Sequence, residues 1–297
     1  MMALRRKFES IQGMARIGFV RSVGQLAGGT ALAQAVMVLA LPILTRLYSP
    51  DDFAIFATYA ATLSILTAGA CLRFEVATPL PEDDRAGASL LALALCSSAL
   101  LSVGLAAVVF LFPGHLAGLF SVPGFEPYLW MIPPGVWLAS SYMAMQYWST
   151  RRKKFPTIAR TRVAQAIGGV GTQLSLGWVG TGPIGLLLGH MVSGGAGIVS
   201  LGRDAWRCDR AVFRSIGPGS MAQAMRDYSK FPKYSAPEAI LSMAGSQLPI
   251  ILIAALAVGP EAGYLMLAMR VMAAPMALIG AAVAQVFLSR ASGEFRG

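Results

Sequence analysis

Charged side chains are scarce in this sequence of 297 residues. They make up 13% of the chain, whereas a typical soluble domain carries about 25%. Hydrophobic residues make up 56%. This balance speaks against an ordinary soluble domain, because so much apolar sequence needs lipid as its solvent.

Cysteine and histidine are scarce as well. The three cysteines, Cys71, Cys96 and Cys208, show no paired spacing, and the two histidines belong to no cluster of metal ligands. The sequence therefore predicts neither a disulfide framework nor a zinc site, and we expect no metal and no cofactor.

The segment 41–84 sets the pattern for the rest of the chain. After an apolar run and the turn Ser49–Asp52, residues Phe53 to Leu72 carry no charge over twenty positions. About 20 apolar residues are enough to cross the ~30 Å hydrocarbon layer as a helix. The segment therefore predicts a transmembrane hairpin.

Later parts of the chain repeat this pattern and predict an all-α polytopic membrane protein with about eight transmembrane helices. We expect these at about 24–47, 53–73, 86–112, 128–149, 157–180, 183–202, 235–258 and 262–287.

Basic residues fall on one side of these predicted helices. Of the 24 lysines and arginines, all except Arg46 and Arg270 lie in the N-terminal segment, the C-terminal segment or every second loop. The opposite loops, 113–127, 180–183 and 258–261, contain none. The positive-inside rule then places both termini in the cytoplasm. The net charge of +10 indicates orientation and contact with anionic lipid headgroups rather than nucleic acid.

The chain divides into three parts. Residues 1–202 form a six-helix lobe, 203–233 a basic cytoplasmic linker with an amphipathic helix, and 234–297 the first two helices of an incomplete second lobe. The apolar side of the linker helix would hold Phe213, Ile216, Met221, Ala224 and Met225. The segments LPILTRLYSPDDFAIFATY and LPIILIAALAVGPEAGYLMLAMR are weakly similar, and a parallel repeat of this kind is typical of transporters.

Two stretches resemble a known family. The first stretch is LTRLYSPDDFAIFATY followed by CLRFEVATPLPEDD, and the second is GPEAGYLMLAMRVMAAPMALIGAAVAQVFLSRAS. Both are similar to the oligosaccharide and polysaccharide flippases. These are the O-antigen (Wzx-type) branch of the multidrug/oligosaccharidyl-lipid/polysaccharide exporter superfamily. Family members have twelve or more helices, so we expect a C-terminally truncated form.

The resemblance implies a bacterial inner-membrane protein that is not an enzyme. It implies two six-helix lobes and alternating access, which moves an undecaprenyl-diphosphate-linked oligosaccharide from the cytoplasmic to the periplasmic leaflet. It also implies a role in surface polysaccharide (O-antigen or exopolysaccharide) biosynthesis, with glycan polymerase and chain-length proteins as further partners.

A lipid-linked sugar diphosphate needs fixed cations and sugar-binding groups, and arginine suits phosphate because its planar fork binds two oxygens. The candidate substrate-binding residues are Arg270, Arg46, Arg73, Gln34 and Gln285. Each has a structural alternative. Arg270 could pair with Glu261 or a backbone carbonyl, or extend to the interface. Arg46 could form a rim salt bridge, Arg73 could anchor the orientation, and the glutamines could bond neighbouring helices.

Two carboxylates are candidates for ion coupling. Glu238 would begin the seventh helix, where a simple N-terminal helix charge is the alternative. Glu75 lies at the inner end of the second helix, two residues after Arg73. Residues two apart do not share a helix face, so we expect no contact between them.

Three other functions compete with the flippase. The first is a multidrug/cation antiporter of the same superfamily. Acidic residues deep in the membrane would favour it, and the predicted spans have none there. A glycan polymerase or ligase needs a large outer loop with catalytic Arg or His, and the outer loops are short. The third is a non-transporting fragment that associates with envelope-glycan proteins.

Overall fold

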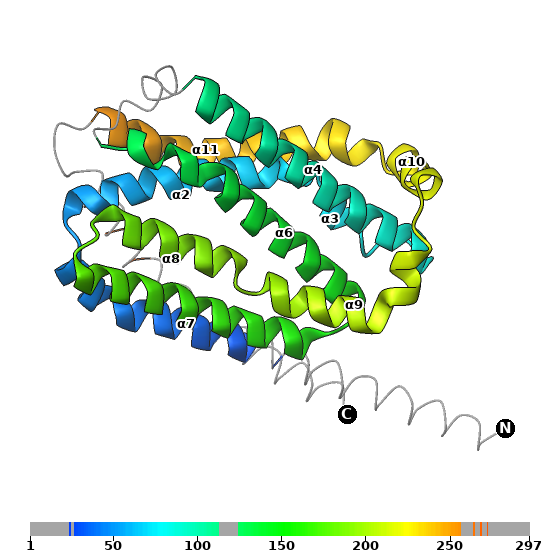
Figure 1. The fold of residues 1–297 in the computed structure, drawn as a ribbon, viewed down its shortest axis with the longest axis horizontal. Coiled ribbons are helices and arrows are strands. Elements are labelled where there is room, and N and C mark those ends of the chain that lie inside the picture. The colour runs from blue at the N-terminus through cyan, green and yellow to red at the C-terminus, as the bar shows by residue number, and fades with distance from the viewer. Residues whose placement is uncertain are drawn as a thin grey trace, which may run out of the picture.

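A computed structural model describes residues 27–112 and 124–256, together with the single residues 24, 264, 268 and 272. The regular structure within these ranges is helical (Figure 1). Its elements are a helix over Ala27–Leu47, α2 (Pro50–Ala70), α3 (Phe74–Ala77), α4 (Asp84–Leu111), the 3₁₀ turn η1 (Glu126–Met131), α6 (Ile132–Arg151), α7 (Phe155–Val179), α8 (Pro183–Gly195), α9 (Ile198–Arg214), α10 (Pro218–Asp227), the π-helical turn η2 (Phe231–Ser235) and α11 (Ala236–Leu256).

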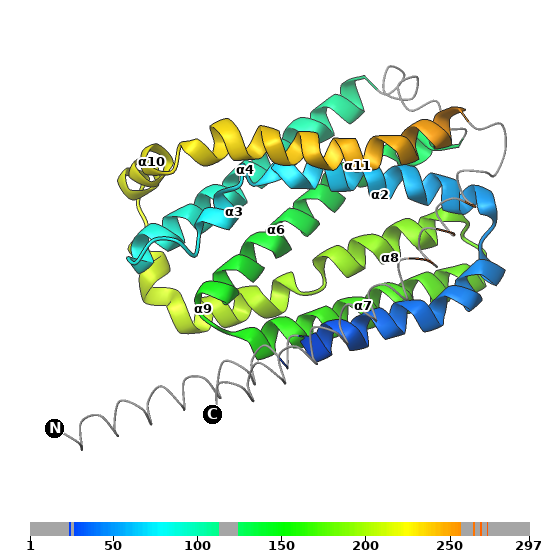
Figure 2. The same ribbon diagram turned by 180° about the vertical axis from the view of Figure 1, so that it is seen from behind.

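Five helical stretches of the described chain are long and apolar enough to cross a membrane. They are Ala27–Leu47, α2, α4, Pro183–Arg214 and Phe231–Ile253. The prediction of an all-α polytopic membrane protein is confirmed. The predicted fourth and fifth spans correspond to α6 and α7, which are more polar but lie side by side with the others in Figures 1 and 2. Apart from the single residues 264, 268 and 272, the predicted eighth helix lies outside the described residues, and so do Arg270 and Gln285.

The expected hairpin forms, and its turn explains where α2 begins. The Ser49 side chain accepts a hydrogen bond from the backbone N–H of Asp52 at 3.2 Å, and the Asp52 carboxylate accepts one from the Ser49 N–H at 2.9 Å. This capping box, with Pro50 in the first turn, starts the helix at residue 50 rather than 53.

The C-terminal end of α2 differs from the expectation. The helix stops at Ala70 instead of continuing to residue 73, because Leu72 and Arg73 adopt left-handed backbone angles, with φ of 51° and 63°. The short helix α3 then restarts at Phe74. Such angles are unusual for residues with a side chain, so the break is a specific feature of this segment.

The core of the bundle lies around α2, α6 and α8. Its fully buried side chains include Phe53, Phe56 and Tyr59 of α2, together with Val136 of α6 and Leu186 of α8. At the edge of this core, the helix Ala27–Leu47 lies along α7 (Figure 2). There the Tyr48 hydroxyl, just beyond that helix, donates to the Gln173 carbonyl at 2.6 Å.

Helix α11 packs antiparallel against α2. Ile240, near the start of α11, contacts Gly69 near the end of α2. At the other end of the contact, Ile250 packs with Ala57 and Ala61. The segment that follows the linker therefore returns to the hairpin and covers α2 (Figure 2).

The predicted helix over 183–202 is interrupted. Helix α8 ends at Gly195 and α9 begins at Ile198. Gly197 at the interruption lies so close to the Tyr142 ring that a side chain would not fit. The glycines let the backbone turn and approach α6 closely. Helix α9 then extends well into the predicted linker.

The predicted linker, residues 203–233, contains α10 and much of α9 rather than one helix. Ala224 is buried, and Phe213, Ile216 and Met221 pack against the same cluster of side chains. Met225, expected on the same side, is 49% exposed.

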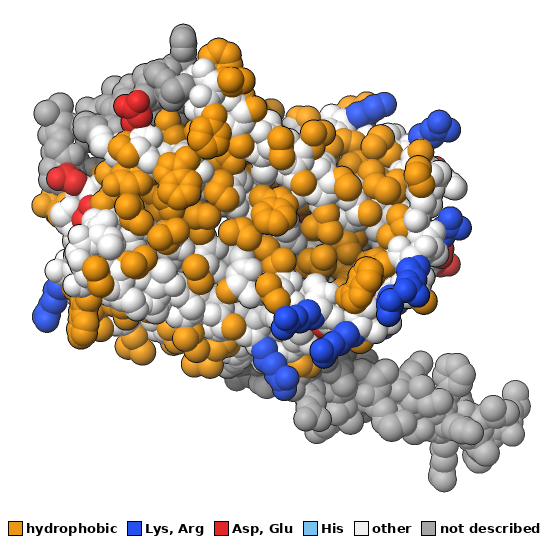
Figure 3. All heavy atoms as spheres, viewed as in Figure 1, with side chains coloured by type: hydrophobic (Ala, Val, Ile, Leu, Met, Phe, Trp, Pro, Cys, Tyr) orange, Lys and Arg blue, Asp and Glu red, His pale blue; other side chains and the backbone are white. Residues whose placement is uncertain are grey.

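The outer surface of the bundle fits a lipid environment. Large apolar side chains such as Leu39, Leu100 and Trp178 are more than 70% exposed. Figure 3 shows a broad hydrophobic band across the middle of one face, and most of the visible Lys and Arg side chains gather at the end where α9 and α10 lie.

Candidate functional site

The break after α2 brings two of the predicted site residues together. Arg73 Nη1 lies 3.8 Å from Glu75 Oε1. The expectation that residues two apart would not meet was wrong, because it assumed a continuous helix. The left-handed backbone at Arg73, which precedes the first turn of α3, allows the side chain to reach the carboxylate.

This ion pair is unequally exposed. The Arg73 side chain is 32% exposed, whereas that of Glu75 is only 2% exposed. Burial raises the pKa of the Glu75 carboxyl, and a backbone hydrogen bond and the Arg73 charge oppose this shift only in part. Glu75 lies beyond the α2 span, and its raised pKa favours the protonated form.

Each partner also has a buried atom that is not satisfied. Oε2 of Glu75 and Nε of Arg73 have no hydrogen-bond partner among the described residues. Buried polar atoms are normally paired, and each exception calls for an explanation such as strain or function. The Arg73–Glu75 pair is therefore the candidate functional site.

The surroundings of this pair are mostly apolar. Helix α3 packs against α4 and α6, and Phe74 and Ala77 are buried in that contact. On the preceding turn, the Cys71 thiol donates a weak hydrogen bond to the Ser140 carbonyl at 3.5 Å.

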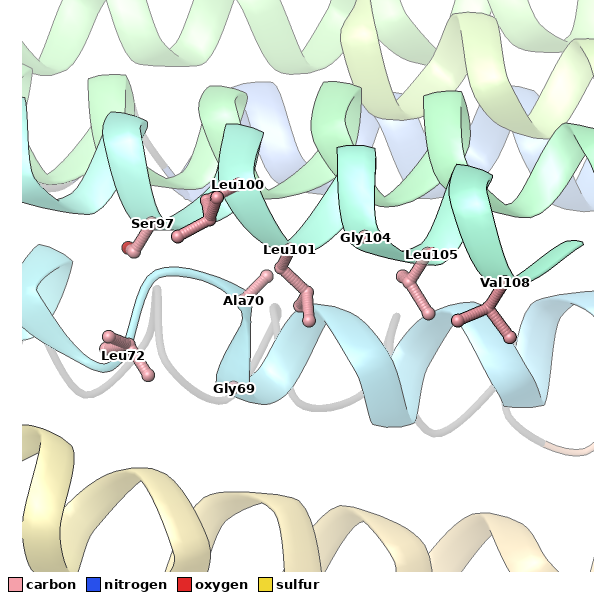
Figure 4. A pocket seen from close by; sticks show the side chains of 9 residues that line it. All are labelled: Gly69, Ala70, Leu72, Ser97, Leu100, Leu101, Gly104, Leu105 and Val108. Carbon is pink, nitrogen blue, oxygen red and sulfur yellow. The ribbon is translucent and has the colours of Figure 1, made fainter. Parts of the chain in front are cut away.

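An apolar pocket of about 490 Å³ lies next to the break, between the end of α2 and α4. Figure 4 shows side chains of α4, such as Leu101, approaching α2, and Leu72 at the break itself. Its lining residues are Gly69, Ala70, Leu72, Ser97, Leu100, Leu101, Gly104, Leu105 and Val108. The candidate site thus combines a cation, a buried acid and a neighbouring apolar surface.

The segment that connects α3 to α4 begins at Thr78, one helical turn after Glu75, and Arg151 holds this segment in place. Its guanidinium donates to the backbone carbonyls of Thr78, Pro81 and Glu82, and it pairs with the Asp84 carboxylate at 3.0 Å. The side chain is 8% exposed. Arg151 therefore fixes the position of the segment that carries the candidate site.

Arg152 extends this network to α9. It pairs with Asp84 at 2.8 Å and with Asp209 at 2.9 Å. The second oxygen of Asp209 accepts a hydrogen bond from Trp148 Nε1 at 3.1 Å. Close by, Lys154 pairs with Asp204 at 2.8 Å.

No role beyond orientation was predicted for these basic residues. The available signal was the run of four cations at 151–154 together with the acidic run Glu82–Asp84, in a chain with only 14 acidic residues. Pairing between such distant segments becomes visible only when α4, α6 and α9 are placed together.

The other predicted residues do not join the site. Arg46 is exposed and precedes the start of α2, whereas Arg73 follows its end, so the 21 residues of α2 separate them by roughly 30 Å. Gln34 is half-buried in the first helix. Glu238 is exposed in the first turn of α11, at the same end of the bundle as Arg73, and makes no ion pair with a described residue.

The comparisons with known proteins give the family. A search of curated proteins and a search of solved structures each found no match. The family model described as "Polysaccharide biosynthesis protein" matches residues 43–293, which is more than half of the chain and includes the hairpin turn, the break after α2 and the basic residues at 151–154. The chain therefore belongs to the polysaccharide biosynthesis protein family.

Proposed function

We propose that the chain is a flippase that moves a polyprenyl-diphosphate-linked oligosaccharide from the cytoplasmic to the periplasmic leaflet of the bacterial inner membrane. Both termini would be cytoplasmic and the glycan would enter surface polysaccharide. The observation that carries this proposal is the incompletely satisfied Arg73–Glu75 pair beside an apolar pocket. The family membership supports the same biosynthetic context.

The chemistry of such a substrate explains the use of this pair. A diphosphate is an anion that must leave water, and an arginine fork offers it two parallel hydrogen bonds. When it is ionised, the Glu75 carboxylate would pair with the Arg73 guanidinium, which lies 3.8 Å away. When Glu75 takes up a proton, the carboxyl is neutral and Arg73 becomes available for the phosphate oxygens.

This exchange would couple proton uptake to substrate binding. Burial already favours the protonated form of Glu75, since its pKa is raised. In an alternating-access cycle, release of the diphosphate on the other side would let Glu75 lose its proton and pair with Arg73 again. The Glu75 carboxylate and the diphosphate would then compete for Arg73, so proton uptake by Glu75 and substrate binding by Arg73 would occur together.

A reconstituted transport assay tests the proposal. The full chain is placed in proteoliposomes with a fluorescent polyprenyl-diphosphate oligosaccharide, and the fraction of glycan accessible to an external glycosidase is followed over time. Arg73→Ala and Glu75→Gln should slow translocation at least tenfold, and Arg73→Lys should recover only part of the rate.

The matched control is Arg85→Ala, which removes an exposed basic residue on α4 that has no ion-pair partner among the described residues. It should translocate at the wild-type rate. Wild-type rates in Arg73→Ala at normal insertion levels would contradict the proposed site, and no translocation by the wild-type chain would contradict the function.

The buried carboxyl of Glu75 favours a second candidate, a multidrug/cation antiporter of the same superfamily. Acidic residues shielded from water are the ligands that such an antiporter uses for protons or sodium. Vesicles with an imposed proton gradient separate the two functions. Proton-driven accumulation of cationic dyes without movement of the lipid-linked glycan would support the antiporter and reject the flippase.

A further inference from the structure

Helix α9 carries a row of four arginines, two on each side of the distorted backbone at Asp209. Arg203 and Arg207 lie one turn apart before it, and Arg210 and Arg214 lie one turn apart after it. All four are exposed, and none forms an ion pair with a carboxylate of the described chain. The row therefore presents uncompensated positive charge.

An apolar pocket of about 220 Å³ lies beside this row. Its walls come from three helices, α4, α6 and α9, and its lining is without charge. The lining residues are Ala88, Leu91, Ala92, Leu95, Met145, Gly202, Ala205, Trp206, Phe213 and Ile216.

Trp206 joins the pocket to the arginines. Its ring lies nearly parallel to the Phe213 ring at 6.4 Å, and the Arg210 guanidinium lies 5.9 Å from its centroid. Arg203, three residues before Trp206, flanks it on the helix surface, and Arg210 contacts it from beyond the distorted backbone at Asp209. The indole is still 54% exposed, as is typical of tryptophan at a membrane–water interface.

We propose that this part of α9 is a binding site for one anionic glycerophospholipid. Its acyl chain would lie in the α4–α6–α9 pocket, against Trp206 and Phe213, and its phosphate would contact Arg203 and Arg210. The charge row and the apolar pocket together select this occupant. A neutral lipid leaves the arginines uncompensated, and a water-soluble anion leaves the pocket empty.

The position of the site agrees with its chemistry. It lies at the end of the bundle where basic side chains gather, next to the hydrophobic band (Figure 3). The inference does not depend on the flippase function, because it concerns a lipid that stays bound on α9 and is not transported.

Lipid binding to the full chain in neutral detergent tests the site. Phosphatidylglycerol and phosphatidylcholine with identical acyl chains are titrated while bound lipid is counted by native mass spectrometry. The wild type should bind phosphatidylglycerol about tenfold or more tightly than phosphatidylcholine, and soluble glycerol phosphate should not compete. Polyprenyl phosphate is titrated in a separate arm.

The double variant Arg203→Gln/Arg210→Gln should lose this preference, with about tenfold weaker binding of phosphatidylglycerol. Trp206→Ala should weaken both lipids, because it opens the pocket. Arg226→Gln on α10 removes an exposed charge at the same end of the bundle and should bind like the wild type.

Three outcomes would overturn the proposal. They are equal binding of the two glycerophospholipids by the wild type, unchanged phosphatidylglycerol binding by the double arginine variant, and tighter binding of polyprenyl phosphate than of phosphatidylglycerol with the same dependence on Arg203 and Arg210. The last would assign these residues to the transported lipid instead.

Discussion

Arg152 Nη2 lies 2.9 Å from Asp209 Oδ1 and so joins the end of α6 to the middle of α9. The side chains are 22% and 9% exposed, and the guanidinium also lies 4.9 Å from the Trp148 ring centroid. At Asp209 the backbone leaves helical geometry, with φ of −118° and ψ of 17°. This contact therefore holds α9 against the bundle at the point where the helix is locally distorted.

Asp209→Asn should destabilise the chain by about 1–3 kcal/mol, because it removes a charge-assisted hydrogen bond from a largely buried arginine. The loss of unfolding free energy should be smaller than for a fully buried isolated ion pair, since Arg152 remains paired with Asp84. The apparent unfolding midpoint in detergent measures the effect. Asp227→Asn, an exposed carboxylate on α10, is the control, and an equal shift in both variants would contradict the prediction.

A second prediction concerns the close approach of α7 and α8. A Cβ atom on Gly189 would lie 2.7 Å from the Gly169 carbonyl and would also collide with the Gln173 side chain. Gly189→Ala should therefore lower stability by about 1–3 kcal/mol through overpacking. The measurement is the shift in unfolding midpoint relative to the wild type.

Gly171→Ala is the matched control on α7, because no atom lies within 4 Å of its added Cβ. It should be neutral, or stabilising by up to about 1 kcal/mol through helix propensity. If both alanine variants lost the same stability, the α7–α8 contact would be looser than described.

Much of the fold could be predicted from the pattern of apolar runs and charges. The hairpin around Ser49 was predicted from two apolar runs and the turn between them. The capping residues Ser49 and Asp52, which start the helix at Pro50, were interpreted only as turn residues. The break after α2 could not be predicted. Leu72 and Arg73 are ordinary helix formers, and their left-handed angles depend on the packing of α3 against α4 and α6.

The candidate site was predicted only in part for the same reason. Arg73 and Glu75 stood out as charges at a span end, but their contact depends on the break. Arg151 and Arg152 were interpreted as orientation signals, since a count of basic residues in loops carries no information on partners in distant helices. The position of Arg46 and Glu238 on exposed surfaces likewise depends on how the helices are rotated.

A third prediction tests the orientation of the chain. Cysteines introduced at the exposed positions Asp51 and Arg214 lie at opposite ends of the bundle. If the positive-inside rule holds, a membrane-impermeant maleimide should label Asp51→Cys in intact cells and Arg214→Cys only after permeabilisation.

The background for this experiment needs Cys96→Ala and Cys208→Ser, because both native cysteines are exposed, whereas Cys71 is buried. The unmodified background should show little labelling before or after permeabilisation. Reversed labelling of the two test positions would place the basic end of the bundle outside and would overturn the direction of transport proposed above.

The last prediction concerns the pH dependence that Glu75 contributes to stability. Its pKa is raised above the ordinary value of 4.5, chiefly by burial, so the folded chain holds this proton to higher pH than the unfolded chain does. Stability from this group is present below about pH 4.5 and is lost as pH rises through the folded pKa, with a slope of at most about 1.4 kcal/mol per pH unit. Glu75→Gln removes the titration, so its unfolding midpoint should gain on the wild type as pH rises from 4 to 8.

Glu82→Gln, at an exposed carboxylate in the following segment, should keep the wild-type profile. Parallel profiles for Glu75→Gln and the wild type would mean that Glu75 does not exchange a proton in this range, and the proposed proton coupling would lose its acid.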